Sequence, residues 1–173
     1  MKKKSILILA TGVAAVLGIT VGVVGASAQR DAQSNGGLLD TATELTKQYR
    51  AAAAAVPSPL PEGVTYPETS DFVSLEKGAM AEPSVADAIA NFYWLCAWED
   101  AAITANAVGD KDAQADALAS IEKWETLPFT TKHVIDTERA WYAHVLEPAQ
   151  RGDFAGMKDE YASSCAMYKD HSK

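Results

Sequence analysis

The sequence predicts an all-α protein, a single bundle of about five helices that follows an N-terminal signal or anchor helix. Apolar residues recur at helical spacing in five stretches after residue 37, and the longest of these, 84–108, contains neither glycine nor proline. No convincing run alternates apolar with polar residues, as a half-buried strand would, although short segments at 63–66 and 71–75 come nearest. The chain has 173 residues, which is enough for one globular domain beside the N-terminal segment.

Residues 1–28 have the pattern of an export signal. Three lysines follow Met1, an uncharged apolar run extends over 6–25, and small residues precede an expected cleavage site after Ala28. The alternative is an uncleaved membrane anchor, because the apolar run is long enough to cross a hydrocarbon core as a helix. Both interpretations place the rest of the chain outside the cytoplasm, and the membrane would be contacted only through residues 6–25.

The helical domain is expected over residues 38–173, after a polar spacer at 29–37 that ends in two glycines. Thr41 and Glu44 fit a capping box for the first helix, and five consecutive alanines favour its continuation. A proline-rich extended connector follows at 57–83, with four of the seven prolines between Pro57 and Pro67. We interpret it as a stiff connector; the alternative is a docking site for an aromatic groove in a partner.

The second helix is predicted to begin at Ser84 and to end before Gly109. Its apolar residues cover two opposite sides, which is typical of a central helix with neighbours on both sides. A tight turn at Gly109 and Asp110 leads into a short amphipathic third helix that Pro128 ends.

A fourth helix is expected from about residue 130 to the region 148–152. Its inner side would carry Ile135, Tyr142 and Leu146, together with Val134, Trp141 and Val145. The last helix is expected to begin after Asp153 as N-cap and to continue through Tyr168.

The two cysteines, Cys96 and Cys165, lie on the inner stripes of the second and last helices. An even number of cysteines in an exported chain favours a disulfide, and packing of the second helix against the last would bring the pair within bridging distance. The alternative is two buried free thiols that act as small apolar groups.

Charged residues in the apolar stripes are the candidates for a ligand or metal site. Glu99 lies in the second helix, while Glu138 precedes His144 by almost two turns in the fourth, so the three could meet in a shared pocket. The structural alternative is an ion-pair set in which Lys158 or Arg139 neutralises the acids. Di-metal bundles use Glu-x-x-His pairs, which this chain lacks, so no metal or other cofactor is predicted.

The formal net charge of −8, which would become about −11 after loss of the three lysines in residues 1–28, disfavours nucleic acid as a partner. The sequence contains no zinc-protease motif, no glycine-rich phosphate loop and no nucleophile elbow, so we predict no catalytic residue. We therefore expect an exported, non-enzymatic binding or interaction module for a protein or small ligand, with Trp94, Trp98 and Trp124 forming a contact groove. The alternative is a metal- or ligand-binding bundle protein or enzyme that uses Glu99, Glu138 and His144.

Overall fold

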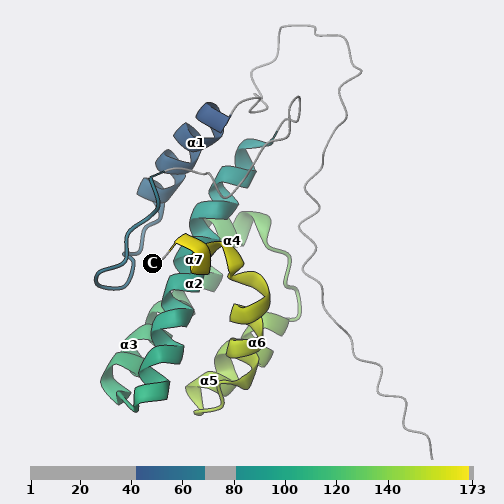
Figure 1. Cartoon of the computed structure of the whole chain (residues 1–173). Coiled ribbons are helices and arrows are strands. Elements are labelled where there is room, and N and C mark those ends of the chain that lie inside the picture. The colour runs from purple at the N-terminus through teal and green to yellow at the C-terminus, as the bar shows by residue number, and fades with distance from the viewer. Residues whose placement is uncertain (1–41, 69–80, 172–173) are drawn as a thin grey trace, which may run out of the picture.

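The computed structural model describes residues 42–68 and 81–171, and helices dominate both ranges, without a strand in either (Figure 1). The predicted all-α class is confirmed for these residues. The signal or anchor segment at 1–28, the spacer at 29–37 and the strand-like segment at 71–75 lie outside the described residues, while 63–66 forms no strand. Within the two ranges, no helix combines the length and apolar character needed to cross a membrane.

The long helix α2 (Pro83–Val108) is the central element, as its two apolar sides predict. It begins one residue earlier than expected because Glu82, in extended conformation, is the N-cap and Pro83 takes the first helical position, where its missing N–H is not needed. Gly109 ends the helix with φ of 75°, a left-handed conformation that glycine adopts without steric cost.

Two helices pack along different parts of α2 (Figure 1). Helix α1 (Ala42–Ala55) places Leu45 and Tyr49 against Ala86 and Ile89 near the start of α2. Helix α3 (Lys111–Ile121) begins with the carboxylate of Asp110 accepting from the main-chain N–H of Ala113 at 3.0 Å, and it continues as the 3₁₀ segment η1 (Glu122–Thr126). The predicted third helix is thus present, with a tighter last turn.

The predicted continuous fourth helix is wrong. Helix α4 (Pro128–His133) ends at Val134, and the chain resumes helical form only at residue 140, before the π-helical segment η2 (Tyr142–Leu146) and α5 (Glu147–Gln150). The reason is local: the carboxylate of Asp136 accepts from the main-chain N–H groups of Ala140 at 2.7 Å and Trp141 at 3.0 Å, which caps a new helix start. Ile135, expected inside, is 87% exposed in the intervening turn.

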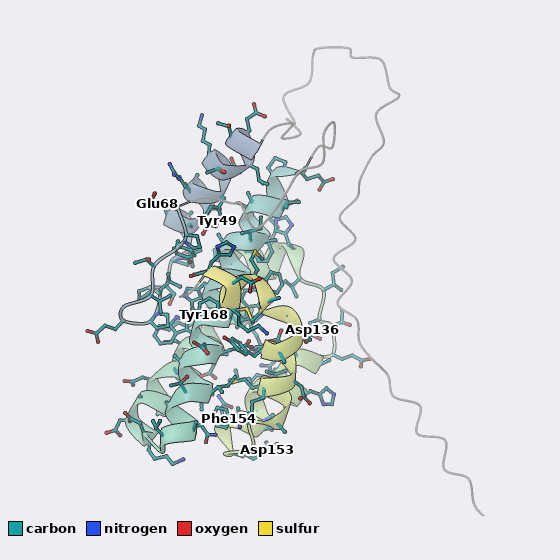
Figure 2. The ribbon with its side chains drawn as sticks, in the orientation of Figure 1. Tyr49, Glu68, Asp136, Asp153, Phe154 and Tyr168 are labelled. Carbon is teal, nitrogen blue, oxygen red and sulfur yellow. A yellow bond between two sulfur atoms is a disulfide. The ribbon has the colours of Figure 1, made fainter. Side chains whose placement is uncertain are left out.

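The predicted last helix is divided at Cys165 into α6 (Ala155–Ser164) and α7 (Ala166–His171). Cys165 has φ −100° and ψ 23°, outside the helical region, although its N–H still bonds to the oxygen of Tyr161 at 3.1 Å. The change of direction lets α7 lie across the middle of α2, where Figure 2 labels Tyr168. The rings of Tyr93 and Tyr168 meet there with centroids 5.0 Å apart.

The connector is fastened to α2 by hydrogen bonds from aromatic side chains. The indole nitrogens of Trp94 and Trp98 both donate to the main-chain oxygen of Pro59, at 2.9 and 3.0 Å. Further along, the hydroxyl of Tyr93 donates to the oxygen of Thr65 at 3.1 Å. A proline-rich segment has few N–H groups of its own, and the α2 side chains supply donors to the oxygens of Pro59 and Thr65.

Candidate functional site

The predicted cysteine pair lies at bonding distance in the structure. The sulfurs of Cys96 in α2 and Cys165 between α6 and α7 are 2.06 Å apart, with their Cα atoms separated by 5.6 Å. Both residues are buried, in a cluster with Tyr93 and Tyr168. A disulfide in this position is consistent with an oxidising compartment.

Glu99 lies one turn after Cys96 and is completely buried. Its Oε2 is 3.5 Å from the sulfur of Cys165, so the carboxyl faces the disulfide. Burial, followed by the neighbouring Glu160 of α6, raises the pKa of Glu99 well above its ordinary value of 4.5. The carboxyl is therefore neutral at the pH where an exposed glutamate is charged.

Glu160 is the partner of Glu99. Oε1 of Glu99 and Oε2 of Glu160 are buried and have no hydrogen-bond partner among the described residues, and Glu160 lies close enough to raise the pKa of Glu99. Two ionised carboxylates that lie close together repel, which favours a proton on one of them. Beside the pair, the hydroxyl of Tyr168 is 3.5 Å from Asp100. Burial and then Asp100 raise the pKa of Tyr161 above its ordinary value.

The expected meeting of Glu99 with Glu138 and His144 does not occur. Glu138 is exposed in the turn after α4, and His144 is exposed on η2. The break at 134–139 is the cause, because it removes the helical register on which that expectation depends. The alternative ion pairs also fail: Arg139 pairs with Glu125, and Lys158 is exposed.

The predicted aromatic contact groove is likewise corrected. Trp94 and Trp124 are buried in the core, so neither ring is available to a partner. Trp98 is half-buried, and its indole N–H is already used by Pro59. The tryptophans therefore act within the fold, where Trp94 and Trp98 hold the connector.

A groove of about 240 Å³ does lie elsewhere, where the end of α1, the start of the connector, α2 and α4 come together. Its apolar lining includes Val56, Pro57 and Phe129, and its polar lining consists of Asp87, Asn91, Lys132 and His133.

Two contacts organise the polar part of this groove. The ring of His133 stacks on Phe129 with centroids 5.3 Å apart and planes 28° from parallel. The amide nitrogen of Asn91 donates to the main-chain oxygen of Asp87 at 2.8 Å, which fixes the orientation of that side chain. In the described ranges, the ion pairs join Arg139 to Glu125 and Arg151 to Glu147, so neither uses Asp87 or Lys132.

Sequence reasoning missed Glu160 and the groove. Glu160 precedes Cys165 by five residues and Glu99 follows Cys96 by three, so the predicted disulfide could have indicated that the two acids lie close together. The groove had no comparable signal, because its residues come from four separate segments and share no motif.

Comparison with protein-family models, with curated proteins and with solved structures finds no match to the chain.

Proposed function

We propose that the chain is an exported helical module that binds a small ligand in the groove between α1, α2 and α4. The observation that carries this proposal is the lining of the groove, which combines an apolar surface with an acid on α2 and two bases on α4. Concave sites with a mostly apolar lining and a few convergent polar groups are the usual form of small-ligand sites.

Export is part of the proposal and has two supports. The first is the lysine, apolar and small-residue pattern of residues 1–28. The second is the disulfide between Cys96 and Cys165, a bond that persists in oxidising compartments.

The charges in the groove select the class of ligand. Lys132 and His133 can pair with a carboxylate, while Asp87 can accept from an ammonium group. Phe129 and Val56 also line the groove and offer an apolar surface to a hydrocarbon or aromatic side chain. A small zwitterion with an apolar body, such as an apolar amino acid, satisfies all three features.

The test compares three ligands that differ by one charged group: phenylalanine, 3-phenylpropanoate without the ammonium group, and 2-phenylethylamine without the carboxylate. Calorimetric titration of the full chain should show that phenylalanine binds at least about 10-fold more tightly than either analogue, a difference of about 1.4 kcal/mol. Lys132→Ala should abolish the preference for phenylalanine over 2-phenylethylamine, and Asp87→Asn should abolish the preference over 3-phenylpropanoate.

Lys158→Ala is the matched control, because Lys158 is an exposed lysine of α6 outside the groove. It should leave the three affinities unchanged. The proposal is wrong if none of the ligands binds at millimolar concentration, or if Lys132→Ala and Asp87→Asn bind phenylalanine as the unmodified chain does.

A further inference from the structure

The surroundings of the disulfide contain the donor atoms of a metal site. The sulfurs of Cys96 and Cys165 and a carboxylate oxygen of Glu99 all lie within 4.8 Å of one another, and all three residues are buried. Glu99 also presents a buried oxygen, Oε1, that has no hydrogen-bond donor among the described residues. A buried carboxyl oxygen without a donor is costly unless a proton or a cation satisfies it.

The chemistry of the donors selects the cation. Thiolates are the preferred ligands of zinc, and a carboxylate oxygen completes mixed zinc sites. In the disulfide the two sulfurs are 2.06 Å apart, whereas two thiolates on one tetrahedral zinc, with Zn–S bonds of about 2.3 Å, lie about 3.8 Å apart, so the sulfurs must separate by somewhat less than 2 Å after reduction. A water molecule can take the fourth position, as it does in zinc sites with three protein ligands.

We propose that the reduced chain binds one Zn²⁺ through Cys96, Cys165 and Glu99, with water at the fourth position, so that metal and disulfide are alternative ways of closing the same site. This inference is independent of the groove, since no residue is shared between the two sites.

A dithiol reductant transfers two electrons and two protons to the Cys96–Cys165 bond, which yields two thiols, and the reductant becomes a cyclic disulfide. Zn²⁺ then displaces the protons of the two thiols, and the Glu99 carboxyl releases its proton on coordination. Reoxidation transfers the two electrons from the thiolates to a disulfide of another protein, which takes up two protons and becomes two thiols. The Cys96–Cys165 bond forms again, Zn²⁺ is released, and Glu99 takes up a proton from solvent.

Contacts other than the disulfide keep the donors together after reduction. The rings of Tyr93 and Tyr168 pack edge to face across α2 and α7, and Tyr168 also approaches Asp100. Met157 of α6 is completely buried in the main core beside residues of α2. These contacts keep α2, α6 and α7 together after reduction, so the two thiols and Glu99 stay near one another while the sulfurs separate.

The test uses Co²⁺ as a spectroscopic substitute for Zn²⁺ with the full chain, reduced by a phosphine, which competes for the metal less than a dithiol does. We expect one equivalent of Co²⁺ to give a thiolate-to-cobalt charge-transfer band and the intense visible bands of tetrahedral coordination. Addition of Zn²⁺ should remove both signals. The oxidised chain should give neither.

Variants separate a built site from two thiols in an opened chain. Cys96→Ser and Cys165→Ser should lose the charge-transfer signal of the paired thiolates. Glu99→Gln should weaken Co²⁺ binding by more than about 10-fold, the lower end of the loss seen for residues that only support a metal ligand. Glu138→Gln, at an exposed carboxyl, is the matched control and should bind as the unmodified chain does.

Circular dichroism on the same samples completes the test. A helical signal that is retained on reduction, or restored by Zn²⁺, supports the site. The proposal is overturned if the reduced chain gives no charge-transfer band, if Glu99→Gln binds Co²⁺ as tightly as the unmodified chain, or if Zn²⁺ leaves a reduced, unfolded chain unfolded.

Discussion

Trp94 and Trp98, one helical turn apart on α2, donate their indole N–H groups to one acceptor, the main-chain oxygen of Pro59. Residues four apart lie on the same face of a helix, so two donors can reach one carbonyl that lies above that face. A carbonyl oxygen has two lone pairs and can accept both bonds. The arrangement joins two donors of the central helix to one carbonyl of the connector.

A double-mutant cycle tests this shared acceptor. Trp98→Phe should lower the free energy of unfolding by about 0.5–1.5 kcal/mol for the lost hydrogen bond, because Trp94 still satisfies the oxygen. Trp94→Phe should cost more, since its ring is fully buried. The double variant should lose more than the sum of the two, by about 0.5 kcal/mol or more, because the oxygen of Pro59 then has no donor. Urea unfolding of the unmodified chain, the two single variants and the double variant measures the four free energies. If the losses of the two single variants simply add up in the double variant, Pro59 is not a shared acceptor.

The buried carboxyl of Glu99 makes the stability of the oxidised protein depend on pH. Its folded pKa is raised above the ordinary value of 4.5, so between these two values the folded state holds a proton that the unfolded chain has released. The free energy of unfolding is therefore highest below about pH 4.5 and falls as pH rises to the folded pKa, by up to about 1.4 kcal/mol per pH unit.

Glu99→Gln should remove this contribution, because the amide stays neutral and can still donate to Glu160. We expect the difference in free energy of unfolding, variant minus unmodified chain, to increase from pH 4.5 towards pH 8 in urea titrations. Glu138→Gln serves as the exposed control. A difference that stays constant over this range would show that Glu99 is ionised in the folded state.

Gly156 is required by the close approach of α6 to η2. A Cβ placed on it would lie 2.1 Å from the main-chain oxygen of His144 and 3.2 Å from its carbonyl carbon, and backbone atoms cannot turn aside as a side chain can. Gly156→Ala should therefore destabilise the protein by about 1–3 kcal/mol, although the same change raises helix propensity. Lys158→Ala, at an exposed position of the same helix, should stay within about 0.5 kcal/mol in thermal and urea unfolding. A Gly156→Ala variant as stable as the unmodified chain would contradict this packing.

The disulfide encloses a long loop, and its removal should be costly. The sequence separation of 69 residues corresponds to about 4 kcal/mol on the chain-entropy model. We expect the double substitution Cys96→Ser and Cys165→Ser to lower the free energy of unfolding by about 2–4 kcal/mol in metal-free buffer. A loss below about 1 kcal/mol would show that the unfolded chain is not restrained by the bond.

The sequence predicted the long helix well because its two ends are determined locally. Pro83 is suited to the first helical position and Gly109 to the left-handed residue after the last turn, so neither depends on distant contacts. The break before residue 140 depends on Asp136, which lies inside the stretch that was predicted as one continuous helix. Sequence periodicity does not distinguish an exposed carboxylate from one that caps a new helix.

The candidate sites were harder to predict because their residues are far apart in the sequence and meet only in the folded chain. The cysteine pair followed from an even count and two inward stripes, but the expected role of Glu138 and His144 required an unbroken helix. Glu160 was missed because a buried acid beside a second acid contradicts simple charge pairing, and only a shared proton or a cation reconciles them. The tryptophans were predicted to form an exposed contact groove. The connector that packs on Trp94 and Trp98 has no regular periodicity, so the sequence did not indicate that it covers them.

The loop closed by Cys96 and Cys165 also has a mechanical consequence. If tension is applied from the N-terminal side, the load passes through α1 and the connector to Pro59 and then, through Trp94 and Trp98, into the middle of α2. Residues 97–164 lie inside the covalent loop and cannot add to the extension while the disulfide remains intact. Such a chain would lengthen by peeling α1 and the connector from α2, while α3 to α6 stayed out of the load path until the bond was reduced.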